Sequence, residues 1–286
     1  MFKQIIKITL LFLFVGGLVA SCKYDKLLKS SNYRMKYNKA LEYYNKGDYV
    51  KSQGLFEQLN PVLKATDRAD TVLFYLAKSY FNQGNYILAE HHFQQFHETF
   101  GNHRWADDAE FQSAFCNYKL SPRPALDQSY TRKAINKFNL FITRHPNHSK
   151  VPECQKYISD LTDKLAMKAY KSARLYYDME DYKAAVIALE NSLKRYPNTS
   201  HREQIQYLIL RSKFLLASNS VSGKEEERFQ ETLDSYYTFT SEYPDSEYNK
   251  EIQKIYNTTQ KNLQTKITDL WIIRKQKHRP QRLHRI

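Results

Sequence analysis

Three short phrases of aromatic and polar residues recur along the chain. They begin at Tyr43, Tyr80 and Tyr176, and each reads two aromatics, a polar turn segment and a tyrosine. In each copy a small residue follows three positions after that tyrosine and a large apolar residue four positions later, namely Ser52 and Phe56, Ala89 and Phe93, Ala185 and Leu189. This spacing keeps one helical face apolar and lets two helices approach closely. Each phrase therefore predicts the end of one helix and the start of the next.

The pattern resembles the tetratricopeptide repeat, a pair of antiparallel helices in about 34 residues. A third unit is placed by Ala134, Phe138, Phe141 and Pro146, and a fifth by Tyr236, Phe239 and Pro244. Both units carry insertions between their helices, at residues 119–129 and 218–226. The sequence thus predicts an all-α fold, a tetratricopeptide-like α-solenoid of about five helix pairs over residues 33–265.

A second phrase recurs where second helices are expected to end. His145, Tyr196 and Tyr243 are each followed by proline and then by asparagine or aspartate. Proline cannot continue a helix, and the Asx or Ser residues after it are expected to cap the next one.

The first residues have the pattern of an export leader. Lys3 and Lys7 precede an apolar run, and Val19-Ala20-Ser21-Cys22 resembles the bacterial lipobox. The resemblance predicts a cleaved signal peptide at residues 1–21, acylation of Cys22 and a lipidated linker at 22–32. The alternatives are an ordinary signal peptide with an accidental cysteine, or a spanning anchor, although the run is shorter than the roughly 20 residues that spanning requires. Lys23, where inner-membrane lipoproteins carry aspartate, favours the outer membrane.

Composition narrows the fold further. The chain has 7 glycines and 23 tyrosines, which disfavours turn-rich β folds and nucleotide-binding α/β folds. Cys116 and Cys154 are too few for a disulfide framework. We expect two buried thiols, with a single bridge as the alternative in an oxidising compartment.

Basic residues concentrate at the end of the chain. The formal charge is +14, or +12 without Lys3 and Lys7, and residues 271–286 contribute +6 of it. Export removes nucleic acid as a partner. The basic C-terminal tail is taken as 266–286. Its end from Trp271 is expected to be solvated and disordered, with contact to anionic lipid headgroups as the alternative.

Catalytic and metal-binding patterns are weak. No phosphate-binding loop or nucleophile elbow occurs. The residues His91, His92, His97 and His103 lack the spacing of a zinc-binding helix and are expected to be surface histidines. The acidic residues Asp107, Asp108 and Glu110 suit a helix start. We expect no catalytic residues, no cofactor, no metal and no enzymatic activity.

The lipobox, the helix pairs and the aromatic-proline junctions, in this order, resemble the BamD family of lipoproteins in the outer-membrane β-barrel assembly machinery. The resemblance covers roughly residues 30–265. It implies a non-enzymatic scaffold in the outer membrane, lipid-anchored through Cys22 and facing the periplasm. Its N-terminal repeats would bind unfolded β-barrel precursors, and its C-terminal repeats the periplasmic domains of a BamA-like barrel subunit.

The repeat register predicts a peptide-binding groove on the first two units. Its expected lining residues are Tyr37, Tyr44, Phe74, Lys78, Phe81 and Asn82. Lys78 is the residue expected to pair with a terminal carboxylate. The alternative for Tyr44 and Phe81 is that they seal the junction between units.

Two rival functions remain. One is a helical-repeat, glycan-binding outer-membrane lipoprotein, and the other is a murein-binding or lytic enzyme on a helical scaffold. Protease shaving of intact cells tests the first, and peptidoglycan digestion tests the second.

Overall fold

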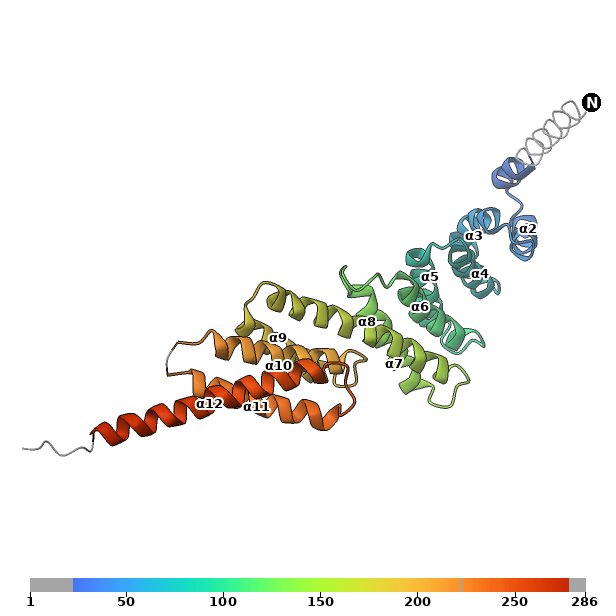
Figure 1. Cartoon of the computed structure of the whole chain (residues 1–286). Coiled ribbons are helices and arrows are strands. Elements are labelled where there is room, and N and C mark those ends of the chain that lie inside the picture. The colour runs from blue at the N-terminus through green and yellow to red at the C-terminus, as the bar shows by residue number, and fades with distance from the viewer. Residues whose placement is uncertain (1–22, 222, 278–286) are drawn as a thin grey trace, which may run out of the picture. The chain divides into compact units, whose positions relative to one another are not determined.

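The computed structural model describes residues 23–221 and 223–277, with side chains to residue 265. Every regular element in this part of the chain is helical, as predicted, and Figure 1 shows consecutive helices lying side by side in pairs within each compact unit. The helices are α2 (Tyr33–Asn45), α3 (Tyr49–Leu63), α4 (Ala69–Asn82), α5 (Tyr86–Thr99), α6 (Ala106–Leu120), α7 (Ser129–Arg144), α8 (Val151–Asp178), α9 (Tyr182–Arg195), α10 (Arg202–Ser218), α11 (Glu225–Glu242) and α12 (Asn249–Lys277).

The three aromatic phrases form the turns between α2 and α3, α4 and α5, and α8 and α9. Each turn has one residue in the left-handed region, at Gly47 (φ 78°), Gly84 (φ 77°) and Glu180 (φ 61°). The next residue caps the second helix of the pair, since the side chains of Asp48, Asn85 and Asp181 accept backbone N–H bonds three positions on. The predicted helix breaks are therefore confirmed.

The small and large positions of the repeat are buried as predicted. Ser52, Ala89 and Ala185 are fully buried, and so is the large residue four positions after each of them. The Ser52 hydroxyl also donates to the Ala40 carbonyl oxygen at 3.0 Å, which ties α3 to α2. The close helix contacts of the pairs therefore form at the positions that the sequence pattern indicated.

The proline junctions end second helices as expected. The helices α7, α9 and α11 end at Arg144, Arg195 and Glu242, two residues before a proline. The capping prediction, however, is wrong for α10, whose N-cap His201 makes no side-chain cap bond. Thr199 instead accepts the N–H of His201, and Ser246 that of Tyr248, so these hydroxyls hold the turn before the helix.

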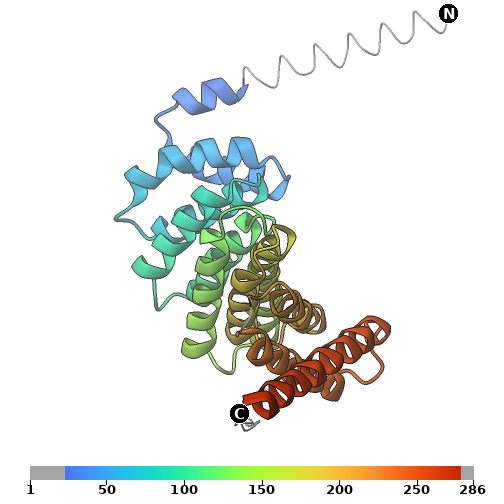
Figure 2. The same cartoon turned by 60° about the vertical axis from the view of Figure 1, so that its left-hand side comes forward.

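The chain divides into two compact units, Met1–Leu161 and Thr162–Ile286, with the boundary inside α8. Two hydrophobic clusters fill the described part of the first unit, one built on α2 to α5 and one on α6, α7 and the start of α8. A third cluster fills the second unit, from Tyr170 to Ile255. Figure 2 shows the same succession of helices from another side.

Two of the predictions concern the ends of the chain. The predicted acylation site, Cys22, lies outside the described residues, as do residues 278–286. The expectation of a disordered end from residue 271 is wrong for residues 271–277, because α12 continues through Lys277. No proline or glycine interrupts the sequence between Asn249 and Lys277, so nothing in it stops the helix earlier.

Candidate functional site

Aromatic rings connect the first helices of successive pairs in the first unit. The Tyr44 ring on α2 meets that of Tyr75 on α4, with centroids 4.8 Å apart. Phe81 at the end of α4 meets Phe115 on α6 at 5.9 Å, and Phe115 meets Tyr157 on α8 at 5.2 Å. These rings are half-buried. We call this set the aromatic row.

Lys78 sits among the rings at the N-terminal part of the row. Its Nζ lies 5.4 Å from the ring centroid of Tyr44 and 5.6 Å from those of Phe74 and Tyr75. A cation within about 6 Å of a ring face is attracted by the ring quadrupole. No carboxylate forms an ion pair with Lys78 among the described residues. The ammonium therefore lies among rings and has no ion-pair partner in the described part of the chain.

Asn82 completes this part of the surface. Its Nδ2 donates to the Tyr44 hydroxyl at 3.1 Å, which joins the ends of α4 and α2. Burial raises the pKa of Tyr44, so the hydroxyl stays neutral. Three of the predicted groove residues, Tyr44, Lys78 and Asn82, are thus brought together.

Phe74 does not line a surface. Its side chain is 4% exposed and stacks on Trp105 at 4.6 Å, with Phe93 and Phe96 also in contact. The expected exposure of Phe74 is wrong because its helical face points into the core of the first unit. The neighbouring residue, Tyr75, lies beside Tyr44 and Lys78, in the position that was expected for Phe74.

The remaining two predicted residues lie apart. Arg68 covers the Tyr37 ring, with 4.8 Å between the guanidinium carbon and the ring centroid. Phe81 contacts Tyr86, Phe93 and Phe115, which agrees with the alternative that it seals a junction between units.

Sequence reasoning missed Tyr75, Phe115 and Tyr157 of the aromatic row. Phe115 lies 34 residues after Phe81, one repeat length, so the register carried into the third unit identifies it. Lys119, whose Nζ is 5.0 Å from the Phe115 centroid, adds a second cation to the row.

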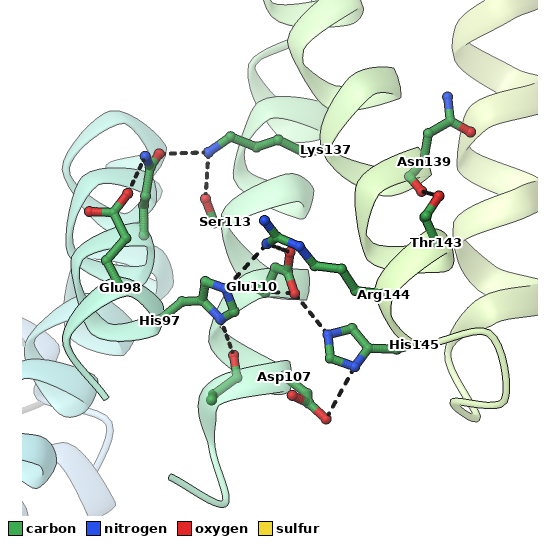
Figure 3. A network of polar contacts seen from close by, with 12 residues as sticks. His97, Glu98, Asp107, Glu110, Ser113, Lys137, Asn139, Thr143, Arg144 and His145 are labelled. Carbon is green, nitrogen blue, oxygen red and sulfur yellow. Dashed lines mark hydrogen bonds and ion pairs between the residues drawn. The ribbon is translucent and has the colours of Figure 1, made fainter. Parts of the chain in front are cut away.

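A polar network occupies the junction of α5, α6 and α7 (Figure 3). Glu110 is 8% exposed, and its two carboxylate oxygens accept bonds from Arg144 Nη1 at 2.6 Å and from His145 Nε2 at 2.9 Å. His97 Nε2 lies 3.9 Å from the same carboxylate. A cavity of about 420 Å³ opens beside this network and is also lined by Lys137 and Leu140.

This network corrects the reading of the acidic residues. Asp107 and Asp108 do lie in the first turn of α6, as expected. Glu110 instead joins α6 to α7, because a buried carboxylate needs donors and Arg144 and His145 supply them.

The expected surface position holds for only one of the four clustered histidines. His91 is exposed, whereas the other three are half-buried. His92 stacks on Tyr80 at 5.4 Å, and burial lowers its pKa. His103 Nε2 lies 3.2 Å from Asp70 Oδ2. Within the described ranges no group of three or more His, Cys, Asp or Glu side chains is placed so that it could hold a metal ion.

Cys116 and Cys154 are free and buried. Burial raises the pKa of Cys116 to about 12 and that of Cys154 to about 11. Both thiols are therefore protonated at neutral pH and poor nucleophiles.

Several apolar side chains are exposed in the second unit near the turn between α8 and α9. Leu175 is 56% exposed and Met179 58%, and Tyr176 and Ile187 are also exposed. These four residues, called the α8–α9 apolar cluster below, lie on both sides of Glu180 along the chain, a residue with a φ of 61°. Grouped exposed apolar side chains of this kind are typical of protein interaction surfaces.

Comparisons with known proteins place this geometry in context. The family model YfiO, described as outer membrane lipoprotein, matches residues 30–213 and 173–267. No curated protein matches the chain. None of the described helices has the length and apolar character needed to cross a membrane.

Several solved structures are similar at low identity. The TPR2AB domain of yeast Sti1 in a pHSP90 complex is 16% identical, with 80% of this chain and 99% of that chain covered and a TM-score of 0.36. A putative kinesin light chain from Podosopora anserina with TPR-like repeats is 15% identical, with 74% of this chain and 97% of that chain covered and a TM-score of 0.31. A variant of that light chain is also 15% identical, with 74% and 96% covered and a TM-score of 0.32.

Proposed function

Because the chain belongs to the YfiO family of outer membrane lipoproteins and is BamD-like, we propose that it is a scaffold of the outer-membrane β-barrel assembly machinery. The family match over residues 30–267 carries the proposal, since it spans all the helix pairs. In this proposal acylated Cys22 anchors the chain to the outer membrane and the repeats face the periplasm. The chain acts by binding, without catalysis or a cofactor.

The aromatic row is the proposed binding surface for unfolded β-barrel precursors. Half-buried rings offer apolar area to an extended segment, and their flat faces tolerate different side chains. Lys78 adds a cation that is not neutralised by a carboxylate among the described residues, suited to a terminal carboxylate. Tyr37, Tyr44, Phe81 and Asn82 remain proposed contacts, whereas Phe74 supports the surface from below.

The α8–α9 apolar cluster is the proposed contact for the periplasmic domains of a BamA-like barrel subunit. Leu175 and Met179 are each more than half exposed, which leaves apolar area for a partner to cover. This placement keeps the precursor surface and the barrel-subunit surface in different units.

The proposed complex is tested by affinity purification from mildly solubilised membranes. We expect a large barrel protein with repeated periplasmic domains to co-purify with the wild-type chain. A Leu175→Glu, Met179→Glu variant should lose it, because burying a carboxylate without a partner is unfavourable. Val62→Glu, which changes an exposed apolar residue of the first unit, is the matched control. Failure of any barrel protein to co-purify with the wild type contradicts the proposal.

The precursor surface is tested with a labelled peptide copied from the C-terminus of a barrel protein. Lys78→Glu should weaken binding about tenfold or more, since a charge-assisted bond is replaced by repulsion. Lys133→Glu makes the same charge change on α7, where the side chain is exposed. Equal loss in both variants would indicate a general charge effect, and full binding by Lys78→Glu would move the site elsewhere.

A further inference from the structure

Residues 23–29 are helical and pack on the first helix pair. Leu27 is 8% exposed and belongs to the core of the first unit. The Tyr24 hydroxyl donates to the Lys51 carbonyl oxygen at 3.1 Å, and the Tyr24 ring meets Tyr43 edge-on at 5.8 Å. The segment expected to be a linker is therefore docked on α2 and α3.

A buried lysine holds the end of this segment. Lys36 on α2 is 5% exposed, and its Nζ donates to the Leu28 carbonyl oxygen at 2.8 Å and to Gln58 Oε1 at 2.7 Å. A glycine leaves room for the other end, because a Cβ at Gly54 would lie 2.6 Å from the Tyr24 hydroxyl oxygen. The docked face is thus shaped by specific residues of the first pair.

The opposite face of the segment is basic and open. Lys23, Lys26 and Lys29 are exposed and follow one another at intervals of three residues. In the part of the chain that the structure describes, none of them forms a hydrogen bond or an ion pair. Asp25 is the one exposed acid among them, so the face carries a net charge of +2.

We propose that this basic face of residues 23–29 lies on the anionic lipid headgroups of the anchoring membrane. The inference rests on the proposed acyl anchor, because Cys22 directly precedes Lys23 and would hold the first turn at the bilayer surface. Lys23 is next to the residue that would be acylated, so its ammonium group would lie close to the lipid headgroups.

The positive charge of the three lysines favours an anionic membrane surface. Each basic residue close to an anionic membrane strengthens binding by roughly fivefold, and the effect decays within a Debye length of about 10 Å at 0.1 M salt. Leu27 and the Lys36 hydrogen bonds fix the segment to the first helix pair. Contact of the three lysines with the membrane would therefore also orient that pair. The first repeat then has a defined side toward the membrane.

The test measures the reactivity of individual lysines in the acylated full protein. The protein is reconstituted into vesicles of phosphatidylcholine alone or with phosphatidylglycerol, acetylated with an amine reagent and analysed by mass spectrometry. On the anionic vesicles we expect reactivity to fall by about fivefold at Lys23, Lys26 and Lys29 and to return in 1 M salt. Three exposed lysines serve as internal controls: Lys133, Lys171 and Lys183.

Equal reactivity of the three lysines on the two kinds of vesicle would overturn the inference. A fall of the same size at the control lysines would also overturn it, because the protection would not belong to residues 23–29. The mass of the mature chain reports acylation of Cys22 separately. A protein that has lost its anchor is therefore distinguished from an anchored protein whose lysines do not contact the membrane. In the second case the barrel subunit should still co-purify.

Discussion

Glu180 allows the turn geometry of the repeats to be tested by opposite substitutions. It occupies the left-handed position that glycine takes in the other two turns, with φ of 61° against 78° at Gly47 and 77° at Gly84. For a residue with a Cβ this conformation costs roughly 1–2 kcal/mol, because the Cβ crowds the following carbonyl oxygen. Glycine avoids that cost but loses more backbone entropy on folding, by roughly 0.5–1 kcal/mol.

The difference predicts that Glu180→Gly raises the free energy of unfolding by about 0.5–1 kcal/mol. Gly84→Ala should lower it by a similar amount. At Gly84 a Cβ would meet nothing within 4 Å, so backbone strain is the only direct cost of that substitution. The two changes together separate conformational strain from packing.

Urea unfolding measures the free energy, and hydrogen exchange assigns the effect to a unit. Amides of α8 and α9 should exchange about two- to fivefold more slowly in Glu180→Gly, whereas α4 and α5 should change only in Gly84→Ala. Glu180→Ala is the control, because it removes the carboxylate and keeps the strain. Stabilisation of the same size by Glu180→Ala, or no destabilisation by Gly84→Ala, would refute the reasoning.

Four further predictions follow from particular residues. Cys22→Ala should leave an unacylated precursor, whereas membrane retention of an acylated variant after a high-salt wash would contradict the lipobox. Ala89→Leu and Ala185→Leu should each destabilise by about 1–3 kcal/mol through overpacking, and unchanged thermal midpoints in both would mean that the repeat register is misplaced. Lys36→Met should speed hydrogen exchange of residues 23–29, since the Leu28 carbonyl loses its donor; unchanged exchange would show that Lys36 does not hold the segment. Phe74→Ala should cost about 3–5 kcal/mol in unfolding experiments as a core residue, and a near-neutral effect would place it on the surface.

The sequence determined the helix pairs and their turns with few errors. Local signals are sufficient for this because a left-handed glycine, an Asx cap or a proline acts within a few residues. Ser52, Ala89 and Ala185 were placed correctly for the same reason, since the period of the repeat fixes which face is buried.

The tertiary structure decided which side chains of the predicted surface are exposed. Phe74 and Tyr75 are adjacent on one helix, and the first is a core residue because Phe93 and Phe96 of α5 and Trp105 of the loop before α6 pack on it. Glu110 and Lys36 are buried polar residues whose partners are 34 and 22 residues away. Periodicity carries no information about such pairs, because hydrogen bonds across helices depend on how the helices pack rather than on local sequence.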